Sequence, residues 1–222
     1  MESYKEYLND NANQKFTFEL TTSQMTMNII NKLKNTNTAG HDGISNKLIK
    51  CVKHEICDVI TLIINQAITT GIFPDSLKIA RVKPLFKKGD SHLTSNYRPI
   101  SILSSLSKLF ERTLFDQLST FLETTNQVNN HQYGYRKKHS TEWAAMELID
   151  RITTDIDKNR IPINIYIDLT KAFDSISHDI LFHKLAHYGI QDNSLNLMVS
   201  YLTNRYQFVD IMVNFRNEIK FL

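Results

Sequence analysis

Residues 161–168 read IPINIYID and contain the most regular alternation in the chain. Isoleucine occupies every odd position, and the even positions hold Pro162, Asn164, Tyr166 and Asp168. Because successive side chains of a strand point to opposite faces, this pattern predicts a β-strand with one face made wholly of isoleucine. Asp168 then ends a buried strand, which is a costly place for a carboxylate without a partner.

Two kinds of partner suit such a carboxylate. A divalent cation is the first, because Mg²⁺ binds one or two carboxylates together with substrate phosphates. The structural alternative is that Asp168 caps the turn at residues 169–174 or forms an ion pair with a lysine. Asp174 lies past that turn and is better suited to bonding within it than to catalysis.

A second alternation, upstream at residues 78–86, predicts a half-buried strand that carries Ala80 and Val82 on one face. Pro84 in the same run favours an edge position, because proline has no N–H to donate to a neighbouring strand. The loop KKGDSHLTSN follows, and then a short extended piece, Tyr97–Ile102. Together these segments predict a strand–loop–strand unit with a basic tip.

Apolar residues at helical spacing predict the remaining elements. Ser23, Ser140 or Thr141, and Ser177 are candidate N-caps, and Gly71 is a helix stop. Two more strands are expected within residues 207–222. This mixture predicts an α/β (α+β) fold without an evident linker. The expected helices cover residues 23–33, 48–68, 106–122, 144–152, 177–189 and 193–202.

The overall charge does not identify a partner. Lysine and arginine number 26 against 23 acidic residues, so the formal net charge is only +3. The distribution says more, since cations gather at residues 78–88 and 136–139, although two solvated loops would have the same pattern. The longest apolar runs fall well short of a membrane span. Cys51 and Cys57 are expected to be buried thiols in a reducing compartment.

Several blocks of the chain stand out by their order. They are AGHDGI at 39–44, GIFP at 71–74, ARVKPLFKKGD at 80–90, NYRPIS at 96–101, QYGYR at 132–136, IYIDLTKAFDSI at 165–176, SHDILFHKL at 177–185 and YGI at 188–190. In this order they resemble the motifs of reverse transcriptases of the non-LTR (LINE-type) retrotransposons, a class of transposable element. The block around Asp168 is similar to the first catalytic motif, and the blocks before it are similar to the fingers motifs. Each block is moderately specific, and their shared order argues against a chance match.

The resemblance implies a role for each matching residue. Asp168 would hold divalent ions, Mg²⁺ or Mn²⁺, and the backbone oxygen of Leu169 would be a further metal ligand. Phe173 would lie under the incoming sugar and select deoxynucleotides, although ordinary core packing also explains an aromatic residue there. The triphosphate-binding residues implied are Lys87, or Lys88 after a one-residue shift, and Arg98. The template- or primer-binding residues implied are Gln132, Tyr135 and Arg136.

The fold implied is a partial right-hand polymerase. Residues 1–160 would form helical fingers with a basic β-hairpin, and residues 161–222 a truncated palm, with no thumb. The chain contains no Asp-Asp pair, which the family places further downstream, so we expect it to be inactive alone and its metal site to need the complete palm. The partners implied are an RNA template, a DNA primer, deoxynucleoside triphosphates and the missing palm, thumb and endonuclease domains, with no membrane.

Two other functions remain open at this point. One is a non-catalytic RNA-binding remnant of a retroelement that keeps the basic hairpin. The other is an interaction protein whose motif match is fortuitous. The resemblance also implies an intracellular ribonucleoprotein, in the nucleus or the cytoplasm.

Overall fold

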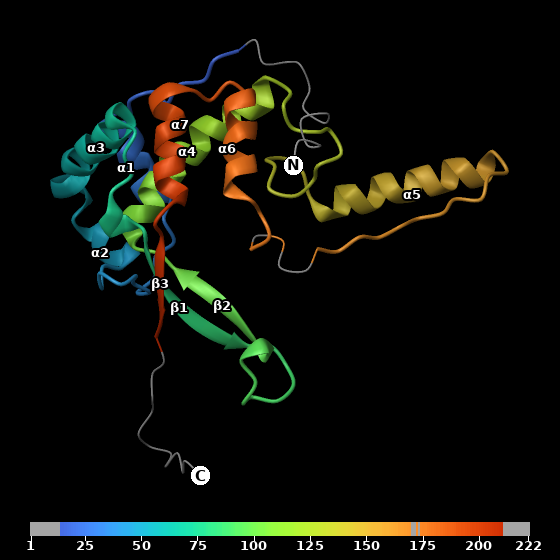
Figure 1. Ribbon diagram of the computed structural model, residues 1–222, viewed down its shortest axis with the longest axis horizontal. Coiled ribbons are helices and arrows are strands. Elements are labelled where there is room, and N and C mark those ends of the chain that lie inside the picture. The colour runs from blue at the N-terminus through green and yellow to red at the C-terminus, as the bar shows by residue number, and fades with distance from the viewer. Residues whose placement is uncertain (1–13, 170–171, 173, 211–222) are drawn as a thin grey trace. The chain divides into compact units, whose positions relative to one another are not determined.

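The computed structural model describes residues 14–169, 172 and 174–210, which form a mixture of helices and short strands (Figure 1). They divide into two compact units: residues 14–118 with 182–210, and residues 119–181. The α-helices are α1 Ser23–Lys32, α2 Asn46–Cys51, α3 Lys53–Thr70, α4 Ser105–Thr124, α5 Thr141–Asp157, α6 His178–His187 and α7 Asp192–Leu202. The strands are β1 Ile79–Phe86, β2 Tyr97–Ile102 and β3 Tyr206–Val209, and Asp75–Leu77 and Thr94–Asn96 are single 3₁₀ turns.

The N-cap of helix α1 lies one residue earlier than expected. Thr22 has extended backbone angles, and its hydroxyl accepts a hydrogen bond from the Met25 N–H, so Thr22 is the N-cap. The prediction of Ser23 as the cap is therefore wrong: Ser23 is already helical, and its hydroxyl donates to Asp58.

The predicted long helix after residue 48 is two helices that meet at Val52. Ser45 caps α2 by accepting from the Leu48 N–H, and α3 then runs to Gly71, which has φ +69°. That left-handed conformation favours glycine and ends the helix as the sequence predicts. Cys57 on α3 is buried, but Cys51 is exposed, because it ends α2 on the outer side, so the prediction of two buried thiols is wrong for Cys51.

The hydrophobic core of the first unit is centred on Phe73, which is completely buried. Its ring meets those of Phe110 and Tyr201 edge to face, with centroids 5.6 and 5.0 Å apart. The Phe73 N–H also donates to the hydroxyl of Ser200 at 3.0 Å. These contacts tie α4 and α7 to the segment that leads into β1. The other large apolar side chains that are fully buried are Ile30, Ile64, Leu109, Ile190 and Leu197.

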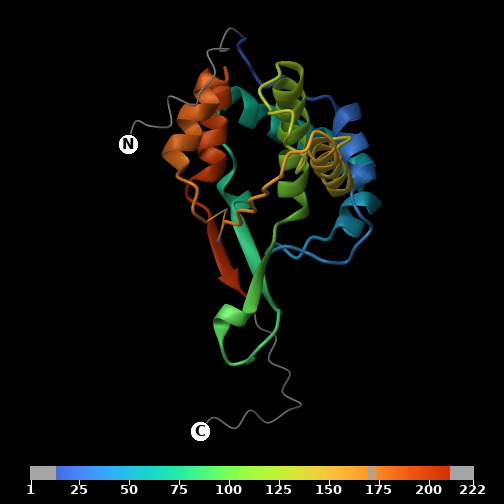
Figure 2. The same ribbon diagram turned by 90° about the vertical axis from the view of Figure 1, so that its right-hand side faces the viewer.

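The three strands form one sheet in the order β2-β1-β3, with β1 antiparallel to β2 and parallel to β3. Both predicted strands of the hairpin are present, and Ala80 and Val82 are the buried residues of β1. Away from the helices of its unit, the β1–β2 pair projects as a two-stranded ribbon (Figures 1 and 2).

Pro84 explains where β3 ends. Among the described residues, the last bond between these strands runs from the Asp210 N–H to the Val82 oxygen, at 3.0 Å. In a parallel ladder the next bond would come from the N–H of residue 84, which proline lacks. The predicted edge position is therefore correct only locally, because among the described residues β1 is paired on both sides up to Val82 and on one side beyond it.

No described residue of the second unit is buried. Its main element is α5. Ser140 caps this helix by accepting a hydrogen bond from the Trp143 N–H, so Ser140 is the correct one of the two predicted caps, Ser140 and Thr141. The four isoleucines at 161, 163, 165 and 167 are 82–91% exposed, and residues 161–169 form no strand. The prediction of a buried strand is wrong for this structure, because no other described strand pairs with the segment and an isolated strand is not stable.

Two remaining sequence predictions have partial outcomes. The first strand of the expected pair after residue 207 is present as β3, and residues 211–222 lie outside the described part of the chain. Within that described part, no helix has the length and the apolar character that crossing a membrane requires.

Candidate nucleotide and template site

The hairpin tip of the first unit is tightly built. The Lys87 N–H donates to the Asn96 oxygen at 2.8 Å, and the Asn96 side chain donates to the Asp90 oxygen at 2.8 Å. Gly89 has φ +95°, and a Cβ there would lie 2.8 Å from the Asn96 amide nitrogen. Glycine is required on both grounds. The loop is therefore held in one conformation by its own polar groups.

The register of the hairpin decides which cations share a face. Leu85 lies opposite Arg98, and Lys83 lies opposite Ile100. Directly opposed residues in an antiparallel pair lie on the same face, and residues two apart do too. Lys83 and Arg98 therefore share one face, and continuing the alternation by one residue adds Lys87. Phe86 and Tyr97 occupy the other face, with ring centroids 5.4 Å apart.

Only part of the basic cluster at residues 78–88 is available to a ligand. Lys78 is buried, and its ammonium group forms an ion pair with Asp75 at 2.8 Å. Arg81 forms an ion pair with Asp210 at 3.5 Å. Lys83, Lys87, Lys88 and Arg98 are exposed and form no ion pair with any described residue. The exposed cations thus concentrate toward the tip of the hairpin.

The loop at residues 126–139, in the second unit, is irregular and carries Gln132, Tyr135 and Arg136. Tyr135 has φ +61° and is 87% exposed. The Gln132 side chain donates to the Gly134 oxygen at 3.3 Å, so it helps to shape the turn. An aromatic ring presented in this way can stack on a base or sugar.

Arg136 is occupied by partners within its own unit. Its guanidinium forms two hydrogen bonds with the Glu123 carboxylate, at 2.9 and 2.7 Å, and a third with the Asn129 oxygen at 2.8 Å. The hydrogen bond from Arg136 lowers the pKa of Glu123, and the same bond raises the pKa of Arg136. The side chain is only 11% exposed. Arg136 therefore fixes the loop on α4.

Asp168 is exposed and follows the irregular segment. Among the described residues its carboxylate has neither an ion pair nor a hydrogen-bond partner, so neither structural alternative is observed there. Leu169 is 68% exposed, so its backbone lies at the surface. Phe173 lies outside the described residues, and its predicted role stays a prediction.

The donor set determines whether a metal ion fits here. A carboxylate and a backbone carbonyl are hard oxygen ligands of the kind that Mg²⁺ prefers. However, the described residues contain no group of three or more acidic, histidine or cysteine side chains that could hold an ion. Among the described residues, Asp168 and Leu169 are therefore not accompanied by the further side-chain ligands that would complete a metal site.

A family model described as "Reverse transcriptase (RNA-dependent DNA polymerase)" matches residues 86–221, which include the hairpin tip, the loop at 126–139 and Asp168. The chain belongs to the reverse transcriptase family.

Relatives of this reverse transcriptase chain place it in the non-LTR branch. The probable RNA-directed DNA polymerase from transposon BS of Drosophila melanogaster is 31% identical over 80% of this chain and 19% of its own length. The corresponding protein from transposon X-element of the same species is 29% identical over 80% of this chain and 20% of its own length. The Pol polyprotein from the type-1 retrotransposable element R2 of Popillia japonica is 28% identical over 60% of this chain and 18% of its own length. The chain thus spans about a fifth of the length of these relatives.

Sequence reasoning missed two residues that shape the reverse transcriptase motifs. Asn96 closes the hairpin tip, and its position next to the Tyr-Arg-Pro block is a signal that turn chemistry could have used. Glu123 holds Arg136 from 13 positions away, and no local pattern in the sequence connects the two. Their roles come from tertiary structure.

Proposed function

We propose that this chain is the fingers and the first part of the palm of an RNA-directed DNA polymerase encoded by a non-LTR retrotransposon. Residues 1–160 form the fingers-like region and residues 161–222 the beginning of the palm in this proposal. The division follows function and differs from the two compact units. The observation that carries the proposal is a hairpin tip with exposed, unpaired cations, Lys87, Lys88 and Arg98, which lie in the same reverse transcriptase match as Asp168.

The hairpin is suited to hold the triphosphate of the incoming nucleotide. Arg98 offers a planar fork for phosphate oxygens, and Lys87 offers a point charge on the same face. Lys88 lies one residue further into the loop and is the second choice for this role. Tyr135 and Gln132 are suited to contact template or primer, whereas Arg136 acts by positioning their loop through Glu123.

In the whole polymerase we propose that Asp168 and the Leu169 oxygen hold divalent metal, together with carboxylates that this chain does not contain. The metal would bind the triphosphate and the primer 3′-hydroxyl when present. We expect the isoleucine segment to become a palm strand once neighbouring strands are supplied. The chain alone is therefore expected not to polymerise DNA.

Primer extension tests the proposal. A longer chain that continues through the family's Asp-Asp hairpin and thumb should extend a DNA primer on an RNA template with Mg²⁺. Asp168→Ala should remove several kcal/mol of transition-state stabilisation. The rate of primer extension should therefore fall on the order of a thousandfold. Asp157→Ala, an exposed aspartate of α5, is the matched control and should retain extension. Equal activity of Asp168→Ala and the parent would refute the assignment.

A second candidate function, RNA binding without catalysis, is favoured by the exposed cations alone. The 222-residue chain would then bind RNA with an affinity that falls as salt rises, with a slope of about 0.7 per phosphate contact on a single strand. Filter binding over a salt series measures that slope. Lys87→Gln and Arg98→Gln should each reduce it, and a response independent of salt would remove this candidate.

A further inference from the structure

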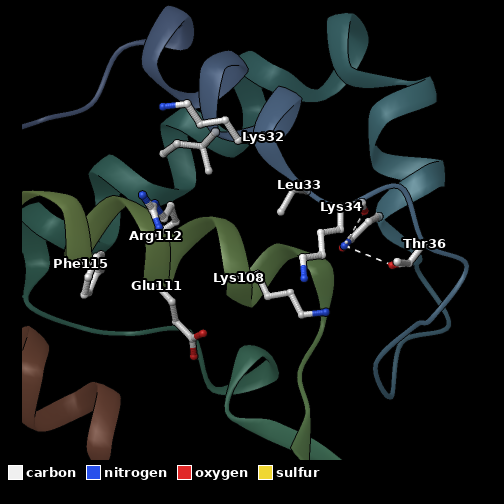
Figure 3. A pocket seen from close by; sticks show the side chains of 10 residues that line it. Lys32, Leu33, Lys34, Thr36, Lys108, Glu111, Arg112 and Phe115 are labelled. Carbon is white, nitrogen blue, oxygen red and sulfur yellow. Dashed lines mark hydrogen bonds between the residues drawn. The ribbon is translucent and has the colours of Figure 1, made fainter. Parts of the chain in front are cut away.

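A cavity lies between α1 and α4 in the first unit, apart from the hairpin (Figure 3). Its volume is about 730 Å³, which is within the range of ligand-binding pockets. The floor is formed by Ile29 and Leu33 at the end of α1 and by Phe115 on α4. These side chains give the cavity a small apolar surface that is open to solvent.

Four cations surround this apolar floor. Lys32 and Lys34 come from the end of α1 and the loop after it, and Lys108 and Arg112 come from α4. Lys34 and Lys108 point to the same side of the cavity from opposite walls (Figure 3). Arg112 forms an ion pair with Asp116 at 3.0 Å. Within the described part of the chain, the three lysines form no ion pair. Glu111 is the acidic residue among the lining residues, so the four cations leave the rim with a net positive charge.

The rim is held in place by Asn46. This side chain is buried, and its amide donates to the Lys34 oxygen at 3.1 Å and to the Thr36 hydroxyl at 3.4 Å. Its oxygen accepts from the Ser105 hydroxyl at 2.8 Å, which connects the loop to the first turn of α4. The Lys47 N–H adds a bond to the Thr36 oxygen at 3.2 Å. The spacing between the two walls is therefore fixed by hydrogen bonds.

The lining favours a peptide over a nucleic acid. Nucleic acids bind through aromatic stacking on open ring faces. Here Phe115 is the aromatic residue of the lining, and the Arg112 guanidinium already lies over its ring, 5.4 Å from the centroid. The rest of the floor is aliphatic, and the Glu111 carboxylate of the lining accepts a hydrogen bond from the Tyr201 hydroxyl at 2.9 Å. Aliphatic anchors between acidic residues match this surface better.

We propose that the cavity between α1 and α4 binds an acidic peptide segment of a partner protein, with an aliphatic anchor on Ile29 and Leu33 and carboxylates on the surrounding lysines. Charge complementarity selects the occupant, and the apolar floor supplies the anchor pocket. The inference does not depend on polymerase activity, because none of these residues belongs to the nucleotide or template site.

Fluorescence anisotropy on the full chain tests the proposal. The probe is a short fluorescein-labelled peptide with aspartate and glutamate flanking two leucines, and saturable binding that weakens with salt is expected. Lys34→Glu and Lys108→Glu should each weaken binding about tenfold, which is roughly 1.4 kcal/mol. Lys15→Glu, an exposed lysine of the same unit outside the cavity, is the matched control and should have little effect. A peptide with serine in place of both leucines should bind as weakly as the cavity variants bind the parent peptide.

Lys34 lies in an exposed loop, so its variant should keep the circular dichroism and urea midpoint of the parent even if the α4 variant does not fold. Affinity that Lys34→Glu leaves unchanged would overturn the proposal. So would an oligouridylate that binds more tightly than the peptide and depends on the same lysines, because the cavity would then be a nucleic-acid site.

Discussion

Strand β1 and the segment at residues 161–168 have the same alternating pattern and opposite outcomes. Residues 161–168 are the more regular of the two, yet their isoleucines are 82–91% exposed and no strand forms. β1 is less regular and contains a proline, yet its residues Ala80 and Val82 are buried on one face of the sheet. The difference is that β1 has β2 on one side and β3 on the other. An alternating sequence can give a strand one apolar face. A stable strand also needs neighbouring strands and a layer that covers that face.

Matched substitutions to aspartate, one in each segment, test the difference in burial most directly. Val82→Asp places an unpaired carboxylate in the core and should destabilise the first unit by roughly 3–5 kcal/mol. Ile163→Asp alters an 85% exposed side chain and should change stability by about 0.5 kcal/mol or less. Urea unfolding followed by circular dichroism measures both. A similar cost for the two variants would mean that the isoleucine face is covered in solution.

A longer chain that supplies neighbouring strands tests whether the segment at residues 161–168 then becomes a strand. In the 222-residue chain the amides of residues 163–167 should exchange as fast as those of an open loop, while those of β1 are protected. In a longer chain with the rest of the palm, protection at residues 163–167 should rise about tenfold or more. Hydrogen exchange with mass spectrometry resolves both segments. Fast exchange at residues 163–167 in the longer chain would refute the palm-strand assignment.

Helix α4 extends the comparison to two carboxylates with opposite shifts. Burial raises the pKa of Glu111, which accepts a hydrogen bond from the Tyr201 hydroxyl at 2.9 Å. A raised pKa in the folded state means that the native protein binds the proton more tightly, so stability should fall as pH rises from the unfolded pKa through the folded one. Glu111→Gln should remove this part of the decline. Urea midpoints across that pH window measure it, and an unchanged slope would contradict the assignment.

Glu123 lies further along the same helix. Its contribution to stability should have the opposite pH dependence, and its effect should be the smallest of these predictions. Its pKa is lowered chiefly by the hydrogen bond from Arg136, so its contribution is present above the unfolded pKa and lost as pH falls through the folded one. The pair lies in the second unit, in which no described residue is buried, so it should contribute little to global stability. Glu123→Gln should therefore act locally, increasing proteolysis within residues 126–139 at neutral pH. Cleavage equal to that of the parent would show that the pair does not hold the loop.

Sequence reasoning succeeded where local chemistry decides the outcome. Tyr97–Ile102, the stop at Gly71 and the cap at Ser140 follow from alternation, left-handed backbone and hydroxyl capping. It failed at Ser23, where two adjacent hydroxyl residues compete for one cap, and at residues 161–168, where the deciding neighbours are distant.

The candidate site divides in the same way. Motifs identified the residues of the family, because their order along the chain is a local property. They gave no sign that Lys78 and Arg81 are occupied by Asp75 and Asp210, or that Arg136 is held by Glu123. Which cations of a basic stretch stay unpaired depends on the acidic residues that the tertiary structure places next to the others.

Pro84 and Pro99 lie directly opposite each other in the hairpin. Since the Lys87 N–H bonds to the Asn96 oxygen, the pair at 84 and 99 is of the non-hydrogen-bonded type, in which main-chain N–H groups would point outward. At this level neither flank of the hairpin offers a donor to another strand. A basic arm that projects into solvent is thereby protected from edge-to-edge aggregation with other copies, and its surface is left for ligands.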